Sequence, residues 1–149
     1  MQLSTNFHLN EMTRSQTALR RGIDNTPDAA TVERLRTLCL TVLQPVRDHF
    51  ARPLTVNSGY RCPELNAAIG SQPTSQHIRG EAADVEIPGL DNRVVAEYIR
   101  DHLDFDQLIL EFYEEGEPSS GWVHVSYVSP EKNRKVCLRI NSSGTHPGL

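Results

Sequence analysis

The chain has 149 residues, of which 38% are hydrophobic and 23% are charged, and its formal net charge is −4. This length fits one domain with a hydrophobic core, and this composition is ordinary for a globular protein. The acidic balance, without any basic stripe, argues against nucleic acid as a partner. No apolar run approaches the roughly 20 residues that a membrane span needs.

The N-terminal segment, from Met1 to His8, lacks the cationic start and the apolar core of a secretory signal. We therefore expect the chain to be made in the cytoplasm. Three cysteines, Cys39, Cys62 and Cys137, are odd in number and widely spaced, and no Cys-x-x-Cys pair occurs. This pattern indicates free thiols in a reducing compartment.

The first third of the chain is predicted to be helical. Asn10 is placed to cap a helix that runs from Thr13 to Arg21 and ends at Gly22. Thr26-Pro27 is typical of a cap followed by proline at the first helical position.

The next helix presents one apolar face with spacings of three and four. That face is formed by Val32, Leu35, Leu38, Val42, Val46 and Phe50. Pro45 is expected to kink this helix, and Arg52-Pro53 is expected to end it.

The remainder of the chain mixes short strands with short helices. Strands are expected over 54–58, 82–87, 107–113, 122–128 and 136–140, helices from Pro63 to Gly70 and from Asp91 through Ile99, and a polar loop over 71–80. Two β-like runs joined by the polar connector 114–121 predict an antiparallel hairpin.

The predicted fold class is α+β, with helices packed on one side of a small antiparallel sheet. We expect one domain over residues 1–149, with its core over about 7–140. The tail over 141–149 is rich in Ser, Gly and Pro and is predicted to be mobile. A monomer is the expected oligomeric state.

A candidate metal site is formed by two distant segments. One reads Ser-Gln-His-Ile-Arg-Gly-Glu-Ala-Ala-Asp over 75–84, and the other reads Trp-Val-His-Val-Ser over 122–126. His77, Asp84 and His124 supply two nitrogens and one oxygen. Three protein ligands leave the fourth position of a zinc ion open for water, whereas structural zinc sites are usually closed by four ligands. An open site of this composition indicates hydrolysis.

The alternation of side chains along a strand supports this site. Asp84 lies on the strand face opposite Ala83 and Val85, and His124 lies opposite Val123 and Val125. Each candidate ligand therefore faces away from an apolar set that would pack under the helices. Gly80 permits a sharp backbone turn between His77 and Asp84.

These segments, preceded by Ser-Gly-Tyr-Arg over 58–61, resemble a known family. It is the zinc D-Ala-D-Ala carboxypeptidase and L-alanyl-D-glutamate peptidase family, which shares its fold with the hedgehog signalling domain. The resemblance covers about residues 7–128 and is to the compact branch found in phage cell-wall lysins. It implies a hedgehog/DD-peptidase-like fold, Zn²⁺ as cofactor, and His77, Asp84 and His124 as its ligands.

The resemblance also implies roles for residues around the metal. Arg61 matches the arginine that holds substrate or stabilises the oxyanion, since a guanidinium binds a carboxylate or a polarised carbonyl with two parallel bonds. Ser75 matches a serine that lines the substrate site. Tyr60 and Trp122 are candidates for the wall of the groove, although ordinary core positions would explain both.

The general base is where the chain departs from the best-known members. Those members carry Glu or Asp three residues before the last histidine ligand, where this chain has Gly121. Peptide hydrolysis still needs a carboxylate that accepts a proton from water and returns it to the leaving amine. We choose Glu111, because the hairpin would bring its strand beside His124, with Gln107, Ile109 and Tyr113 on the same face.

Other acidic residues remain open as the base. Glu114, Glu115 and Glu117 lie in the connector, which could deliver one of them on substrate binding. Glu81 and Glu86 flank Asp84 and are interpreted as surface residues.

The resemblance implies that the substrate is the stem peptide of peptidoglycan. An endopeptidase that opens the cell wall, acting at the wall or in the periplasm, is favoured over a D,D-carboxypeptidase that trims the terminal D-Ala. A non-catalytic, zinc-stabilised binding module is the alternative from another class, and Gly121 favours it.

Overall fold

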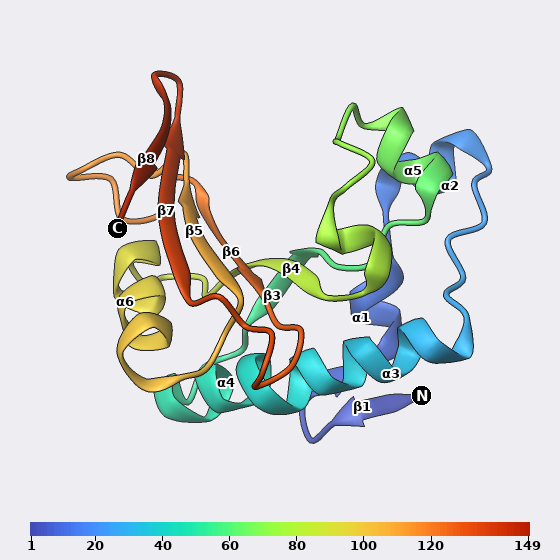
Figure 1. The fold of residues 1–149 in the computed structure, drawn as a ribbon, viewed down its shortest axis with the longest axis horizontal. Helices are drawn as coiled ribbons and strands as arrows, with labels where there is room; N and C mark the ends of the chain where they lie inside the picture. The colour runs from blue at the N-terminus through green and yellow to red at the C-terminus, as the bar shows by residue number, and fades with distance from the viewer.

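The computed structural model describes residues 1–149, in which one face of a six-stranded sheet packs against helices, while the short helices α2 (Gln16–Arg21) and α5 (Pro63–Ala68) lie apart from the sheet (Figure 1). The strands follow the order β3-β4-β6-β5-β7-β8, and they are β3 (Thr55–Ser58), β4 (Ala82–Glu86), β5 (Gln107–Glu111), β6 (Trp122–Ser126), β7 (Val136–Asn141) and β8 (Gly144–Pro147). A separate two-stranded ribbon near the N-terminus consists of β1 (Gln2–Ser4) and β2 (Phe7–His8). The predicted α+β class is confirmed.

The helices are short and are joined by tight turns. They are α1 (Leu9–Thr13), α2 (Gln16–Arg21), α3 (Ala29–Leu38), the π-helical turn η1 (Cys39–Leu43), α4 (Gln44–Phe50), α5 (Pro63–Ala68), the 3₁₀ helix η2 (Gln76–Arg79) and α6 (Asn92–His102). None of them is long and apolar enough to cross a membrane.

One hydrophobic core joins the sheet to the long helical run. Val85 of β4, Val125 of β6 and Leu108 of β5 are fully buried and belong to the same cluster as Leu35 of α3 and Ile99 of α6. Removing these side chains from water is the main favourable term in folding. The apolar alternation that the sequence predicts for β4 and β6 is therefore confirmed, and the opposite sheet face is left for polar residues.

The register of the central strands brings polar residues of that opposite face together. Asp84 of β4 pairs with His124 of β6, and Glu111 of β5 pairs with Trp122, two residues before His124. Because side chains two apart on a strand share a face, Glu111, His124 and Asp84 all project from the same side of the sheet.

The prediction of a wholly antiparallel sheet is wrong at one pair, since β5 and β7 are parallel. After β6 ends at Ser126, the chain crosses to the start of β5, where Val136 N–H donates to the Asp106 carbonyl. The strand that follows must therefore run in the same direction as β5.

The predicted mobile tail is instead the strand β8, which pairs antiparallel with β7. The turn between them is fixed by the Asn141 side chain, whose Oδ1 accepts hydrogen bonds from both the N–H and the hydroxyl of Ser143. Such Asx turns are a common local means of reversing the chain.

The single helix predicted from Thr13 to Arg21 is two helices. Arg14 has an extended backbone, with φ −68° and ψ 141°, and the hydroxyl of Ser15 caps α2 by accepting from Ala18 N–H. The predicted stop at Gly22 is confirmed, because this residue is in the left-handed conformation with φ 64°.

The long apolar helix starts and bends differently from the prediction. It begins after Asp28, whose side chain accepts from Thr31 N–H, rather than at Thr26. In place of a simple kink at Pro45, the π-helical turn η1 precedes that residue, and Gln44 N–H donates to the Cys39 carbonyl, five residues back. A π-turn accommodates the proline, which has no N–H to continue the α-helical pattern.

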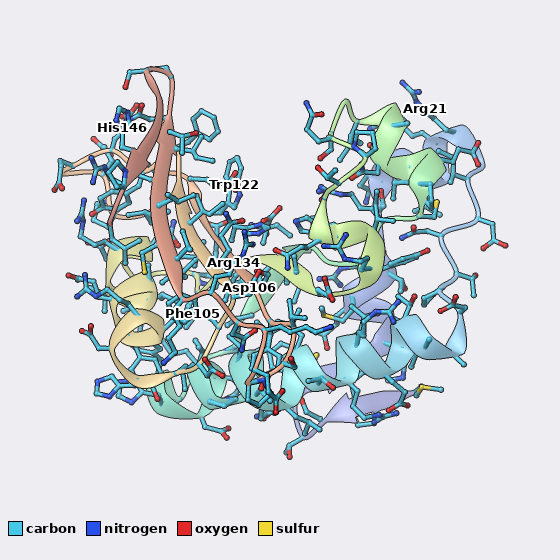
Figure 2. The ribbon with its side chains drawn as sticks, in the orientation of Figure 1. Arg21, Phe105, Asp106, Trp122, Arg134 and His146 are labelled. Carbon is cyan, nitrogen blue, oxygen red and sulfur yellow. The ribbon has the colours of Figure 1, made fainter.

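A buried carboxylate fixes the loop between β6 and β7. Asp106 is 2% exposed and binds Arg134 through both oxygens, with Oδ1 accepting from Nε at 3.0 Å and Oδ2 from Nη2 at 2.7 Å (Figure 2). Oδ2 also accepts from the Gln76 side chain of η2 at 3.0 Å. The hydrogen bonds from the Arg134 side chain lower the pKa of Asp106 the most, and those from the Arg134 backbone and the Gln76 side chain add to this effect. Burial opposes them, and the pKa of Asp106 falls to about 2.

We predict that Asp106→Asn lowers stability at neutral pH by roughly 1–3 kcal/mol, because charged hydrogen bonds are lost. A folded pKa of about 2 lies below the unfolded value of about 3.9, so this stabilisation is complete above pH ~4 and lost as pH falls through 2. Urea unfolding should show that the difference in free energy of unfolding between wild type and Asp106→Asn becomes smaller as the pH falls from about 4 to 2. Asp104 is a more exposed neighbour, so Asp104→Asn should lower the free energy of unfolding by less than Asp106→Asn does. An equal loss of stability in the two variants would contradict the role of Asp106.

Candidate metal centre

The first candidate ligand is delivered by a short helix that the sequence analysis treats as a loop. His77 lies in η2, which the Ser75 hydroxyl caps by accepting from His77 N–H at 3.2 Å. Gly80 ends this helix with φ 73°, and a Cβ there would lie 2.8 Å from Thr31 Cγ2 of α3. The turn between His77 and Asp84 therefore requires glycine for its conformation and for its close approach to α3.

The His77 ring is held in one orientation by the main chain. Its Nδ1 lies 2.7 Å from the carbonyl oxygen of Gly59, and the residue is 2% exposed. A carbonyl can only accept, so Nδ1 carries the proton and Nε2 keeps its lone pair. Nε2 faces the Asp84 carboxylate, 3.5 Å from Oδ1. The sequence analysis did not identify Gly59 as this partner, although the residue belongs to the Ser-Gly-Tyr-Arg motif.

Asp84 lies between the two imidazoles. Its Oδ1 is 3.0 Å from Nδ1 of His124 and 3.5 Å from Nε2 of His77. Burial favours the neutral acid, but the hydrogen bonds and charges of His124 and His77 together outweigh it, and the pKa of Asp84 falls well below its usual range. This carboxyl group is therefore ionised at neutral pH.

The three residues fit a divalent cation. One ligand atom from each of His77, Asp84 and His124 lies within 4.8 Å of the others, although they come from η2, β4 and β6. Two imidazole nitrogens and one carboxylate oxygen suit zinc, and three protein donors match an open, catalytic type of site. The oriented His77 ring adds the outer hydrogen bond that metal-binding histidines usually make.

Glu111 lies at the edge of this cluster. Its Oε1 is 4.0 Å from Nδ1 of His124, and its side chain is 18% exposed. Burial raises the pKa of Glu111 and the nearby Asp84 charge adds to that effect, while His124 and Arg61 oppose it. β5 ends here because Phe112 adopts a left-handed conformation with φ 55°, so Tyr113 does not continue the face predicted for it.

The other acidic residues lie outside the cluster. Glu114, Glu115 and Glu117 are exposed in the connector, and Glu115 binds Arg93 at 2.7 Å. Glu86 accepts from the Asn57 side chain. The prediction of a surface position for Glu81 is wrong, since it is 7% exposed and binds Arg79 at 2.8 Å.

Arg61 and Ser75 form one hydrogen-bonded unit beside the cluster. The Arg61 guanidinium contacts the hydroxyls of Ser58 through Nη1 and of Ser75 through Nη2, both at 3.4 Å. Its Nε is buried and has no hydrogen-bond partner. Burial lowers the pKa of Arg61 and the charges of Asp84 and Glu111 oppose this, so the guanidinium is electrostatically coupled to both carboxylates.

Two hollows meet at this unit. The larger, about 750 Å³, is lined by Ser75, His124 and twelve other residues from the 71–79 segment, β5, β7 and the loop after β6. The smaller, about 300 Å³, is lined by Ser58, Tyr60, Arg61 and residues of α2 and α5. The Arg61–Ser75 contact joins the two linings, and His124 is the one cluster residue that lines either hollow, the larger one.

Tyr60 and Trp122 occupy different surroundings. The Tyr60 ring packs against the core and lines only the smaller hollow, while its N–H donates to the Met12 carbonyl. Trp122 lies beside Phe112, with ring centroids 5.5 Å apart, and its Nε1 is buried without a partner. Trp122 lines neither of these two hollows, and it is the cross-strand partner of Glu111 in the β5–β6 pair.

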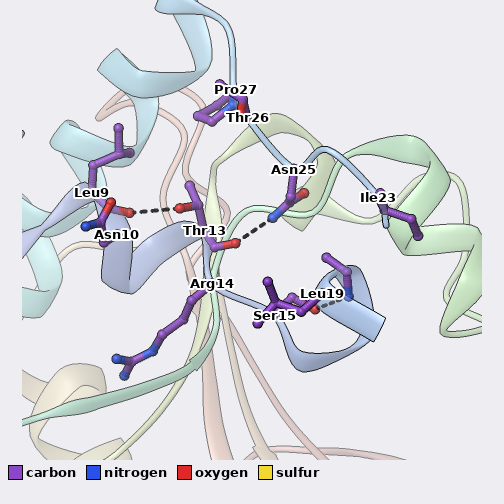
Figure 3. A pocket seen from close by; sticks show the side chains of 11 residues that line it. Leu9, Asn10, Thr13, Arg14, Ser15, Leu19, Ile23, Asn25, Thr26 and Pro27 are labelled. Carbon is purple, nitrogen blue, oxygen red and sulfur yellow. Dashed lines mark hydrogen bonds between the residues drawn. The ribbon is translucent and has the colours of Figure 1, made fainter. Parts of the chain in front are cut away.

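A separate pocket of about 350 Å³ lies between α1, α2 and the segment before α3 (Figure 3). Asn25 braces it, donating to the carbonyls of both Thr13 and Tyr60 and accepting from Cys62 N–H. No residue of the cluster lines this pocket. The hydrogen bonds of Asn25 connect the α1–α2 turn to the segment that carries Arg61.

The comparisons with known proteins agree with the geometry. A family model described as peptidase M15 matches residues 5–126, a range that includes the three candidate ligands, Glu111 and Arg61. No curated protein matches the chain. Since the match covers most of the sequence, the chain belongs to the peptidase M15 family, a family of zinc-dependent metallopeptidases.

Proposed function

We propose that the chain is a zinc endopeptidase that hydrolyses a peptide bond in the stem peptide of peptidoglycan. The observation that carries the proposal is the meeting of three ligand atoms within 4.8 Å with a partly buried carboxylate, Glu111, 4.0 Å from one of them. This combination is suited to metal-assisted hydrolysis.

Nε2 of His77, Oδ1 of Asp84 and Nδ1 of His124 would hold the metal. When bound, zinc supplies a Lewis acid that polarises the scissile carbonyl and lowers the pKa of water. The role of the protein is to keep the donors in place, which the Gly59 carbonyl does for His77 and the β4–β6 register does for Asp84 and His124.

Glu111 would act as general base and then as general acid. It would take a proton from the attacking water and deliver it to the nitrogen of the leaving amine. Its pKa is raised, first by burial and then by the Asp84 charge, in the direction that makes a carboxylate a stronger proton acceptor.

Gly121 occupies the sequence position where the best-known members carry an acid. It has φ 65°, and a Cβ there would overlap the Glu111 carbonyl oxygen and lie 2.6 Å from the Phe112 carbonyl carbon. This backbone leaves no room for a side chain at 121. A carboxylate on β5 reaches the cluster instead, which supports Glu111 as the base and weakens the case for a non-catalytic module.

Arg61 would bind a carbonyl oxygen or a carboxylate of the substrate. Its position is fixed by Ser58 and Ser75. A guanidinium placed beside the reacting carbonyl stabilises negative charge that develops on its oxygen. Ser75 would act mainly by holding Arg61 and His77, since its hydroxyl contacts both residues.

The two hollows that meet at the Arg61–Ser75 contact favour an endopeptidase over a D,D-carboxypeptidase. An enzyme that removes one terminal residue needs little room beyond the scissile bond, whereas an endopeptidase must hold chain on both sides. The volumes of about 750 Å³ and 300 Å³ provide that room. The polar residues that line both hollows suit a peptidoglycan stem peptide, which carries amides and carboxylates.

Replacing a ligand tests the metal site. We expect His77→Gln to lose bound zinc, because Nε2 is one of only three donors. Zinc per chain after dialysis measures this, and zinc should raise the melting temperature of the wild type but not of the variant. His102→Gln, at an exposed position on α6, is the matched control and should keep its zinc. Full zinc content in His77→Gln would contradict the assignment.

Replacing the proposed base tests the chemistry. Glu111→Gln should keep zinc and lose turnover by about 10²–10⁴-fold, the usual contribution of a general base. Chelator-sensitive release of muropeptides from purified peptidoglycan, followed by mass spectrometry, measures turnover and identifies the bond cut. Glu114→Gln, Glu115→Gln and Glu117→Gln should change turnover little. Loss of activity in one of these and not in Glu111→Gln would move the base to the connector.

Substitution of Gly121 tests why the base lies on β5. Gly121→Ala should be less stable than Gly116→Ala by roughly 2 kcal/mol, because both positions have positive φ but only Gly121 has neighbours within 4 Å. Unfolding in urea gives the difference. Gly121→Glu should also fail to restore turnover to Glu111→Gln. Restoration would show that the backbone at 121 accepts the acid of the better-known members.

A further inference from the structure

We propose that Lys132 and Arg134 form a subsite that recognises a carboxylate in the segment of substrate lying in the larger hollow. This rests on the proposed function, since the same hollow would hold the peptide on one side of the scissile bond. The inference assigns specificity to a loop that contributes no metal ligand, no base and no oxyanion donor.

The larger hollow has a positive lining on a negatively charged protein. Arg79, Lys132 and Arg134 line it, against the single acid Asp106, whereas the whole chain has a net charge of −4. Asp106 is 2% exposed and both of its oxygens are bonded to Arg134. Asp106 and Arg134 therefore compensate each other's charge, and Arg79 is paired with Glu81 at 2.8 Å, so the uncompensated charge in the lining is the cation Lys132.

Arg134 has donors left for a ligand. Nε and Nη2 bind Asp106, while Nη1 makes no hydrogen bond within the protein. The bidentate pair with a buried carboxylate also fixes the plane of the guanidinium. A ligand that binds Nη1 therefore meets a group that loses little conformational freedom.

Lys132 lies in the same loop, and its ammonium forms no ion pair. The loop is ordered by its own hydrogen bonds, because Lys132 N–H donates to the Ser129 carbonyl at 3.1 Å and Val128 N–H donates to Asn133 Oδ1 at 2.8 Å. Asn133 in turn donates to Asp104. The loop is therefore built to hold its backbone in place while Lys132 projects to solvent.

The rest of the lining suits a peptide that carries a carboxylate. The amide side chains of Gln72, Gln76 and Gln107 line the hollow and can bond a peptide main chain without adding charge. An extended polyanion is disfavoured by the net charge of −4. The observations therefore favour a peptide segment with an isolated carboxylate beyond the scissile bond.

The test compares two lysines of the same loop, one that lines the hollow and one that does not. Lys132 and Lys135 are the only lysines of the chain, three residues apart in the same loop, and Lys135 lies outside the hollow, 3.8 Å from Asp104. Lys132→Glu and Lys135→Glu change the net charge equally, so the second controls for long-range electrostatics. Soluble muropeptides are used as substrate, with their carboxylates either free or converted to amides by carbodiimide and ammonia.

We expect Lys132→Glu to lower kcat/KM on free-carboxylate muropeptides by about two- to fivefold, mainly through KM, as for an exposed ion pair. On the amidated muropeptides the same variant should differ little from wild type. Lys135→Glu should differ little on either substrate, and the Lys132 effect should shrink at high salt. An equal effect of Lys132→Glu on both substrates, or no effect on either, would overturn the subsite.

Binding separates this subsite from the proposed peptidase activity. Calorimetric titration of each muropeptide preparation into the zinc-loaded protein reports recognition without turnover. If wild type binds the free carboxylates more tightly than the amides, and Lys132→Glu removes that preference, the subsite stands even if no bond is cut. If wild type cuts the muropeptides but shows no such preference, the peptidase proposal stands and the subsite falls.

Discussion

The site depends on one largely buried carboxylate, Asp84, held between two imidazoles that come from different parts of the chain. Burying a carboxylate is costly unless its neighbours compensate. The β4–β6 register supplies His124 at 3.0 Å, and η2 supplies His77 at 3.5 Å. The glycine turn that closes η2 on α3, and the Gly59 carbonyl that orients His77, matter because they bring the second imidazole to that carboxylate. Asp84 of β4 is therefore the residue at which η2 and β6 meet.

The position of the proposed base follows from the same sheet. Residue 121 precedes β6, and its backbone lies against the carbonyl of Glu111 on the neighbouring strand. Positions 111 and 121, ten residues apart in the sequence, are thus adjacent in space. The carbonyl groups of Glu111 and Phe112 lie too close to Gly121 for a side chain there, while Glu111 projects from the face that carries His124. The β5–β6 register places Glu111 beside the metal donors, so a carboxylate on β5 can take the role that position 121 has in the best-known members.

The sequence predicted those features that have a local period or a local motif. Alternation in β4 and β6 placed Asp84 and His124 on the polar face, and the choice of Glu111 followed from the hairpin. The sequence could not predict the parallel pairing of β5 with β7, because pairing direction depends on where a long loop returns. The Asp106–Arg134 bond and the contact of His77 with Gly59 were missed for a related reason. Each joins isolated polar groups that have no periodic neighbours, so nothing in the local pattern indicates them.

The charges around the cluster are arranged asymmetrically, and this has a consequence for how a substrate would lie. Arg61 borders the smaller hollow, while Lys132 and Arg134 line the larger one. Arg61 is partly buried and interacts electrostatically with Asp84 and Glu111, so its interactions are less screened by solvent and depend on the position of the reacting carbonyl. Lys132 is exposed and screened by salt, so it discriminates weakly between ligands by charge. Arg61 would then contribute to the chemical step, and Lys132 to the selection of substrate. The loop that carries Lys132 contributes no metal ligand, so its sequence can vary without disturbing Asp84.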